Sequence, residues 1–204
     1  PLSHDEVVHM KGSLFGKVPG TEEQKFATVR AFWAYMLAHP GKKLLFMGAE
    51  LGQYSEWDFA SELPFELLCK PENSALYSYF KEINKFYKSN KPLWDLDFDG
   101  NGFQWICPDE SEKNIIGFVR KDTQGKELVF ICNFSGITVS DFRLGVTGTG
   151  RYSVVMSTDE TRFGGNGSLC ENACYIVEKT PHHGLPHSIT IDLPPLTAVF
   201  LRKT

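Results

Sequence analysis

Hydrophobic positions in the first part of the chain recur with the period of an α-helix. Thr21 stands three residues before Gln24, the arrangement of a helix N-cap with its reciprocal partner. The apolar positions that follow keep helical spacing until Pro40-Gly41 stops the run: Phe26, Val29, Trp33, Met36 and Leu37. A second stripe starts near Asn73 or Ser74 and ends before Pro92: Leu76, Tyr79, Phe80, Ile83, Phe86 and Tyr87. The pattern therefore predicts two amphipathic helices.

A short, wholly apolar run lies between these two helices. It extends from Leu44 to Met47 and is bounded by Lys43 and Gly48. Its length and flanking residues favour a strand buried on both faces, as in a parallel sheet. Residues 1–94 are accordingly predicted to follow the order strand end, loop, helix, strand, loop, helix. These are two βα units, which do not make a complete fold.

The helical period disappears after Trp94 and short β-rich runs replace it. Each run is bounded by Gly, Asn, Asp or Pro, which is typical of strands joined by turns. The predicted strands lie near Phe103–Ile106, Ile115–Arg120, Leu128–Phe134, Phe142–Leu144, Tyr152–Ser157, Tyr175–Val177, Ile189–Leu193 and Thr197–Leu201. Such a series indicates an antiparallel β-sandwich over residues 95–204. The predicted fold class is α/β plus all-β.

Composition narrows the function classes. The hydrophobic content of 42% is that of a globular protein. The net charge of −4 does not indicate nucleic acid or an anionic membrane as a partner. No apolar run approaches the roughly 20 residues of a membrane helix. Five scattered cysteines favour reduced thiols in a cytoplasmic protein. We expect no metal, because Cys170 and Cys174 have no second ligand pair, and we interpret the loop from His182 to His187 as a solvated turn.

Candidate catalytic and sugar-binding residues lie at the start of the chain. His4 and Asp5 precede a glycine-punctuated loop from Lys11 to Gly20, as a sugar-binding pair does at the mouth of an α/β barrel. A loop carboxylate beside an imidazole can bind sugar hydroxyls and stabilise an oxocarbenium-like centre. The dipeptide alone is more typical of a capping Asp and a core His. Glu6 is interpreted as a group that orders the loop.

A second candidate follows the apolar run. Gly48 and Gly52 allow a tight turn, and Glu50 lies between them. The segment is not a phosphate-binding fingerprint, because neither Gly-x-Gly-x-x-Gly nor Gly-Lys-Ser/Thr is present. Glu50 is either a substrate contact or a structural group that bonds neighbouring loop amides.

Several sequence motifs, taken together, closely resemble the glycogen (1,4-α-glucan) branching enzymes of the α-amylase family. The resemblance runs through both parts of the chain. It is carried by Leu2-Ser3-His4-Asp5-Glu6-Val7-Val8-His9, Lys11-Gly12-Ser13-Leu14, Lys42 to Gly48, Glu50-x-Gly52-Gln53, Glu56-Trp57, Leu96-Asp97-Phe98-Asp99, Gly102-Phe103-x-Trp105-Ile106, Phe118-Val119-Arg120, Cys132-Asn133-Phe134, Pro186-His187-Ser188 and Leu193-Pro194-Pro195-Leu196. The His-Asp motif marks only the α-amylase family, and the flanking motifs are the more specific ones.

The resemblance implies a fold and a reaction. Residues 1–94 would be the last two βα units of a TIM (β/α)8 barrel, and residues 95–204 its C-terminal sandwich. The parent enzyme would cleave an α-1,4-glucan and transfer the chain to a glucose 6-hydroxyl by a retaining double displacement. Asp5 would be the carboxylate that stabilises the transition state. His4, and with less support Glu50, would bind substrate.

The same resemblance implies what this chain lacks. The nucleophilic Asp and the acid/base Glu are expected upstream of Pro1, on the remainder of the barrel, so the chain is predicted to be inactive alone. The expected partner is an α-1,4-glucan such as glycogen, with no cofactor, nucleic acid or membrane. The chain departs from many members at Met10, Ala49 and Pro64, which leaves acceptor preference open.

Two alternatives stay open at this stage. One is another α-amylase-family hydrolase, either debranching or trehalose-releasing. The other is a non-catalytic glucan-binding module, with aromatic side chains as stacking platforms. We also expect the sandwich to pack on the barrel through four aromatic residues: Trp94, Phe98, Phe103 and Trp105.

Overall fold

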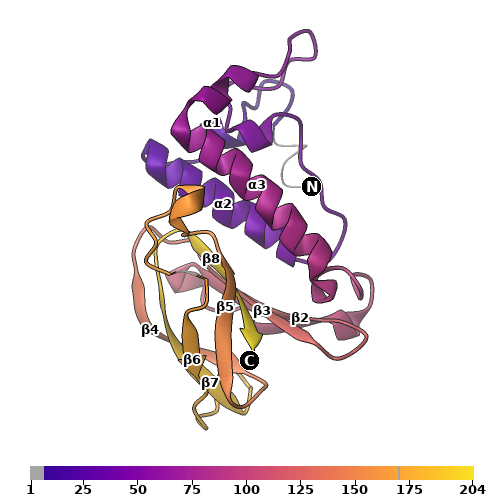
Figure 1. Ribbon diagram of the computed structural model, residues 1–204, viewed down its shortest axis with the longest axis vertical. Coiled ribbons are helices and arrows are strands. Elements are labelled where there is room, and N and C mark those ends of the chain that lie inside the picture. Colours follow the sequence, from indigo (N-terminus) through magenta and orange to yellow (C-terminus); the bar gives the residue numbers. More distant parts are fainter. Residues whose placement is uncertain (1–6, 170) are drawn as a thin grey trace.

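The computed structural model describes residues 7–169 and 171–204, which form a helical region and a β-region (Figure 1). The helices are α1 Leu14–Lys17, α2 Glu22–Ala38 and α3 Pro71–Ser89. The strands are β1 Phe103–Cys107, β2 Ile115–Lys121, β3 Glu127–Asn133, β4 Val139–Val146, β5 Arg151–Ser157, β6 Cys174–Ile176, β7 His187–Leu193 and β8 Thr197–Lys203. Eight predicted strands are therefore confirmed, with ends that differ by at most three residues.

The strands form two antiparallel sheets. Six of them make one sheet in the order β1-β2-β3-β8-β5-β6, and β4 pairs with β7 in the other. The second sheet covers one face of the first, and α2 and α3 lie on the other side (Figure 1). The predicted antiparallel sandwich is thus present. The six-stranded sheet is the middle layer of three, between the two-stranded sheet and the helices.

Alternate residues of the central strands point into two different cores. On β3, Phe130 packs toward the helices while its neighbour Ile131 packs toward the two-stranded sheet. On β8, Phe200 and Leu201 divide in the same way. Phe130 pairs in register with Phe118 on β2 and with Phe200 on β8, and the ring centroids lie 4.9 and 5.2 Å apart. Because side chains alternate across a strand, a doubly covered sheet shows continuous apolar runs.

The helices begin and end for local reasons. The Thr21 side chain accepts from the Gln24 amide, and the Gln24 side chain accepts from the Thr21 amide, so the predicted capping box is present. Helix α3, the second of the two predicted helices, begins at Pro71, earlier than predicted. Proline is favoured in the first turn of a helix, which accounts for this start. Trp33 of α2 is fully buried and meets Phe80 of α3 at a centroid distance of 5.5 Å.

A buried arginine joins the helical region to the sandwich. Arg120 of β2 is fully buried and donates to the carbonyls of Ala38 at 2.6 Å and Gly102 at 3.2 Å. Its remaining guanidinium nitrogen lies 2.5 Å from the Asp97 carboxylate. Both carbonyls and the carboxylate come from segments outside β2, so one side chain fixes three of them.

The expected aromatic contact between the two regions is only partly correct. Phe103 and Trp105 lie 5.7 and 6.3 Å from the His39 ring, at the end of α2. Phe98 is 80% exposed, but its ring centroid lies 5.6 Å from the Lys42 ammonium group, so it also meets the first region; the contact of Trp94, which is 37% exposed, stays a prediction. The buried part of the junction is built from the side chains of α2 and the middle sheet around Phe118 and Phe130.

The predicted strand from Leu44 to Met47 is wrong for this structure. No strand is assigned to these residues, and Leu44, Leu45 and Met47 are 38%, 37% and 54% exposed. A strand buried on both faces needs packed layers on both sides, and the described residues supply no such cover. The described strands are all antiparallel, so the barrel units stay a prediction.

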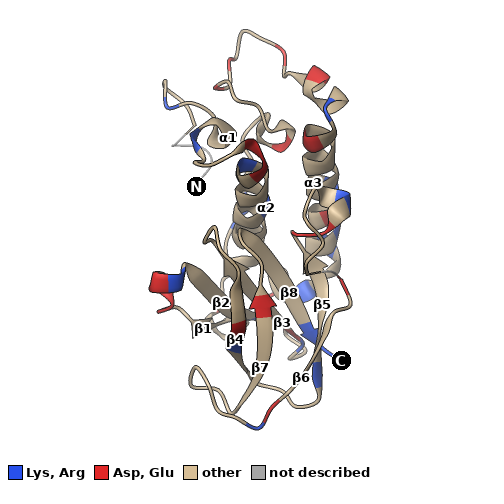
Figure 2. Ribbon diagram, turned by 90° about the vertical axis from the view of Figure 1, so that its left-hand side faces the viewer, with Lys and Arg blue, Asp and Glu red and all other residues tan. Residues whose placement is uncertain are grey.

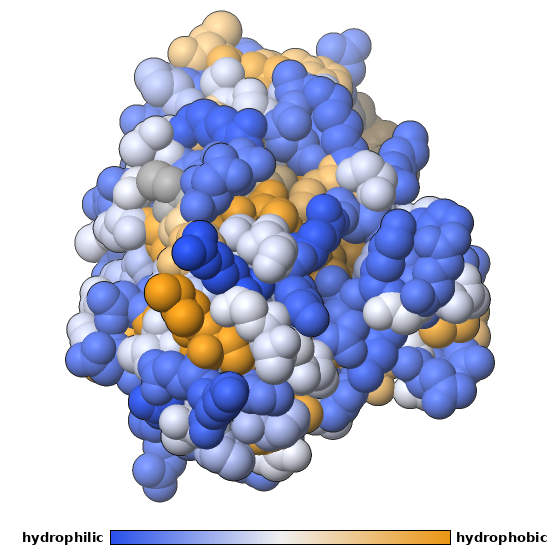
Figure 3. Space-filling view, turned by 60° about the horizontal axis from the view of Figure 1, so that its bottom comes forward, coloured by the Kyte–Doolittle hydropathy of each residue, from blue (hydrophilic) through white to orange (hydrophobic). Residues whose placement is uncertain are grey.

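Charged and apolar residues are both found on the surface of the described residues. Acidic and basic residues are both spread over the ribbon (Figure 2). On the face shown in Figure 3, apolar areas are interrupted by polar ones. Among the described residues, no helix has the length and hydropathy needed to cross a membrane.

Candidate functional site

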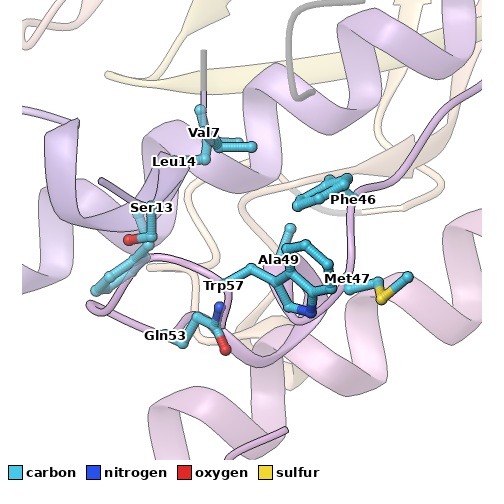
Figure 4. A pocket seen from close by; sticks show the side chains of 9 residues that line it. Val7, Ser13, Leu14, Phe46, Met47, Ala49, Gln53 and Trp57 are labelled. Carbon is cyan, nitrogen blue, oxygen red and sulfur yellow. The ribbon is translucent and has the colours of Figure 1, made fainter. Parts of the chain in front are cut away.

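Two loops that are far apart in sequence enclose a small pocket (Figure 4). The first loop follows the predicted His4-Asp5 pair, and the second follows the apolar run at 44–47. The pocket is lined by Val7, Ser13, Leu14, Phe15, Phe46, Met47, Ala49, Gln53 and Trp57. His4 and Asp5 themselves lie outside the described residues. Val7, two residues after Asp5, is 5% exposed, so the chain is packed into the pocket wall directly after the pair.

Ser13 holds the two loops together. Its hydroxyl accepts from the Gly16 amide at 2.8 Å as the N-cap of α1. The same hydroxyl donates to the Tyr54 carbonyl at 2.9 Å. Phe15 lies edge-on to Tyr54 at 4.9 Å and also packs against Phe26 of α2 at 4.6 Å. The first loop is therefore attached both to the second loop and to the helix core.

Glu56 joins the two loops through both of its carboxylate oxygens. Its Oε1 accepts from the Met10 amide at 2.9 Å, and its Oε2 accepts from the Gly12 amide at 2.8 Å. These two hydrogen bonds lower the pKa of the Glu56 carboxyl, because they stabilise its charged form. Glu56 belongs to the Glu56-Trp57 motif of the family resemblance, but its contact was not predicted, since a contact across 44 or 46 residues leaves no local pattern.

The turn around Glu50 is shaped by two glycines. Gly48 and Gly52 both have left-handed backbone, with φ of 81° and 66°. A Cβ on Gly48 would lie 2.5 Å from Oε1 of Gln53, a pocket residue that is 5% exposed. Glu50 is half-buried and does not line the pocket, and its Oε2 has no hydrogen-bond partner among the described residues. Its role as a substrate contact stays a prediction.

The remaining wall of the pocket is aromatic. Phe46 and Trp57 meet edge to face, with ring centroids 5.3 Å apart and an interplanar angle of 83° (Figure 4). Offset or edge-on pairs of this kind are the favoured aromatic arrangement. Trp57 is half-buried, so one part of its ring packs inside the protein while the other reaches the surface.

The histidine loop packs more closely than the solvated turn that was predicted. His183 is largely buried, lies 3.6 Å from the Glu110 carboxylate and accepts from the Gly145 amide at 3.3 Å. Burial lowers the pKa of His183, and the neighbouring His182 acts in the same direction. Within residues 7–169 and 171–204, no group of three or more His, Cys, Asp or Glu side chains is placed to hold a metal ion.

Four of the five cysteines lie in the described part of the chain, and all four are free thiols. Cys107 and Cys132 are buried, whereas Cys69 and Cys174 are exposed. Burial raises the pKa of Cys107 to about 12, so this thiol stays protonated and unreactive. Among the described residues these four form no disulfide, and the cytoplasmic location stays a prediction.

Comparison with known proteins finds similarity over both parts of the chain. Residues 105–204 match the family described as "Alpha amylase, C-terminal all-beta domain". The chain is 44% identical to the 1,4-alpha-glucan branching enzyme GlgB of Aquifex aeolicus over 99% of its own length and 32% of that protein. It is 45% identical to the corresponding enzyme of Aromatoleum aromaticum, over 98% of the chain and 31% of that protein.

A solved structure adds evidence on the fold. A debranching enzyme from Nostoc punctiforme superposes with a TM-score of 0.59 at 14% identity, over 87% of this chain and 31% of that one. At this identity the likeness concerns architecture only. The chain spans about a third of the length of the curated relatives that it matches.

Proposed function

Since the chain is a relative of the 1,4-alpha-glucan branching enzymes, we propose that it forms the C-terminal part of an enzyme with that activity. The observation that carries the proposal is the extent of the similarity. The all-β family covers only residues 105–204, but the identity to branching enzymes extends over 99% of the chain. It therefore includes both loops of the pocket as well as the sandwich.

The proposed reaction is a chain transfer. The parent enzyme cleaves an α-1,4 link of a glucan, holds the released chain as a glycosyl-enzyme and passes it to a glucose 6-hydroxyl. Asp5 stabilises the positive charge of the oxocarbenium-like transition state, and His4 hydrogen-bonds sugar hydroxyls beside it. Glu50, with a carboxylate oxygen that lacks a partner among the described residues, is a further substrate contact.

The covalent step needs two more carboxylates. A retaining mechanism uses a nucleophile and an acid/base group about 5 Å apart across the scissile bond. We assign both to the part of the parent enzyme that this chain does not span, and we expect the chain alone to be inactive. The parent is a cytoplasmic enzyme in this proposal, in keeping with the four free thiols.

The first part of the chain is proposed to complete a (β/α)8 barrel. Leu44, Leu45 and Met47 are exposed although their run is wholly apolar, which is unfavourable unless another layer covers them. Neighbouring strands of the same barrel, contributed by the rest of the parent enzyme, would provide that layer. The pocket loops would then lie at the carboxyl ends of the strands, where barrel enzymes bind substrate.

The alternative of a glucan-binding module finds no support in the aromatic geometry. Phe103 and Trp105 meet at 88°, so they do not form a flat platform for a sugar ring. A debranching or trehalose-releasing hydrolase would differ in its products. New α-1,6 links in a linear glucan indicate branching, whereas free short sugars indicate hydrolysis.

Substitution of Asp5 tests the proposal in the full-length enzyme. Asp5→Ala should reduce branch formation by about a thousandfold or more, because the group stabilises charge that develops in the transition state. Thermal unfolding should be little changed. Asp58→Asn, in the second loop, provides a matched loss of one carboxylate. Wild-type activity in Asp5→Ala would contradict the assigned role.

A further inference from the structure

We propose that Glu56 is a positioning residue for the reaction, and that it acts by clamping the turn from His9 to Gly12, which follows the His4-Asp5 pair in the sequence. This inference rests on the proposed function and concerns the same site. Its basis is the pair of hydrogen bonds from the Met10 and Gly12 amides, at 2.9 and 2.8 Å.

The clamped turn has an unfavourable backbone. His9 and Met10 are consecutive non-glycine residues with φ of 61° and 66°, and Gly12 follows at 75°. Left-handed backbone costs roughly 1 kcal/mol or more per L-residue. A turn of this kind persists only where surrounding contacts determine it. The carboxylate of Glu56 supplies such a contact on both sides of Lys11.

The clamp is built for a charged group. Both oxygens of Glu56 accept from backbone amides, and hydrogen bonds of this kind are stronger when the acceptor is ionised. The pKa of the Glu56 carboxyl is lowered accordingly, so the clamp remains charged at neutral pH. A glutamine in its place would present an amide nitrogen to one of the two N–H groups, and one hydrogen bond would be lost.

The position of the clamp links it to the reaction. His9 is four residues after Asp5, and Val7 between them is fixed in the pocket wall. Movement of the turn would therefore shift Val7 and the pocket wall and, in the proposed function, the pair that precedes Val7 in the sequence. Misplacement of a catalytic group by about 1 Å can cost as much as a hundredfold in rate. A residue that only stabilised the fold would affect unfolding without changing turnover.

Asp58 offers a matched control in the same loop. Its carboxylate accepts from the Ala60 amide at 2.9 Å and from the Ser61 hydroxyl at 2.6 Å. Both partners lie within three residues, so these contacts order only their own turn. The pKa of Asp58 is also lowered by its hydrogen bonds, first by that from Ser61. The two carboxylates thus share their chemistry and differ in what they hold.

The experiment measures branching kinetics of the full-length enzyme and its variants with a linear glucan. E56Q should lower kcat about tenfold with KM changed less than about twofold, since the loss falls on the transition state. D58N should leave both constants unchanged. In an M10G background, where the turn carries less strain, E56Q should cost only about threefold in kcat.

Each outcome decides the inference. Wild-type kcat in folded E56Q, or equal effects of E56Q and D58N, would overturn it. If E56Q does not fold, E56D is measured instead. Aspartate keeps the charge, but its side chain is one methylene shorter, so the carboxylate lies farther from the two amides. Wild-type kcat in that variant would also overturn the inference. If the wild-type enzyme forms no α-1,6 links, the proposed function fails, and that result is distinct from normal turnover in E56Q.

Discussion

The sandwich and the apolar run at 44–47 differ in how far they bury their apolar residues. In the sandwich, Ile131 and Leu201 are fully buried between two sheets that the chain itself provides. In the apolar run, Leu44 and Leu45 are equally apolar but remain 38% and 37% exposed. Local sequence made both segments candidates for strands. Only the one whose covering layers lie within the described residues became a strand.

This difference separates local propensity from tertiary context. Strand propensity largely reflects how well a side chain fits a covered, pleated surface, so it is realised where cover exists. The helices of the first region do find that cover, because α2 packs on β3 and β8 and shares the core of Phe118 and Phe130. The helices of the first region are therefore covered by the sandwich, whereas Leu44, Leu45 and Met47 of its apolar run remain exposed.

The strongest test removes the polar link between the two regions. Arg120→Met should lower the free energy of unfolding by about 3–5 kcal/mol, because it leaves the Asp97 carboxylate and two buried carbonyls without their donor. Arg143→Met removes an exposed pair with Glu178 and should cost at most about 1 kcal/mol. Urea denaturation measures both. Equal losses would show that the regions are not coupled through Arg120.

A second test compares one residue type in the two regions. Leu201→Ala should cost about 2–5 kcal/mol, since it opens a cavity in a fully buried core. Leu45→Ala should cost no more than about 0.5 kcal/mol in this chain, because its side chain is already partly in water. In the full-length enzyme, the cost of Leu45→Ala should rise toward the value for Leu201→Ala. An unchanged cost there would contradict the proposed barrel.

The smallest effect concerns Lys43, beside the apolar run. Burial lowers the pKa of its ammonium group to about 8 in the folded protein. The unfolded chain keeps this lysine protonated up to about pH 10.4, so it binds more protons than the folded protein between these values. Stability relative to Lys43→Met should therefore rise between pH 8 and pH 10, by about 1 kcal/mol given partial exposure. Below pH 7 the difference should be constant; a fall above pH 8 would contradict the assignment.

Much of the fold could be predicted because its signals are local. The strands of the sandwich were found from apolar runs and turn residues, and α2 from its cap and its stop at Pro40. The start of α3 was placed late, since Pro71 in a first turn was not used as a signal. The exposure of Phe98 was not foreseen, because an aromatic residue is buried or exposed according to partners that spacing does not reveal.

The site was less accessible to prediction from sequence. His4 and Asp5 lie outside the described residues and stay a prediction, as does the role of Glu50. Ser13 and Glu56, which join the two loops, belong to motifs of the family resemblance, but their contacts were not predicted because the partners are more than 40 residues away. The glycines at 12 and 48 were the local sign that backbone in both loops takes unusual conformations.

The packed layers on both faces of the six-stranded sheet should also determine how fast its amide hydrogens exchange. Strands β3 and β8 lie at its centre, with a packed layer on each side and a paired strand at each edge. Their amide hydrogens can meet solvent only when the whole assembly opens, so their exchange with deuterium should report global unfolding. Amides of the exposed run at 44–47 should exchange through small local openings. The slowest amide exchange in this molecule is thus expected in the sheet that both cores share.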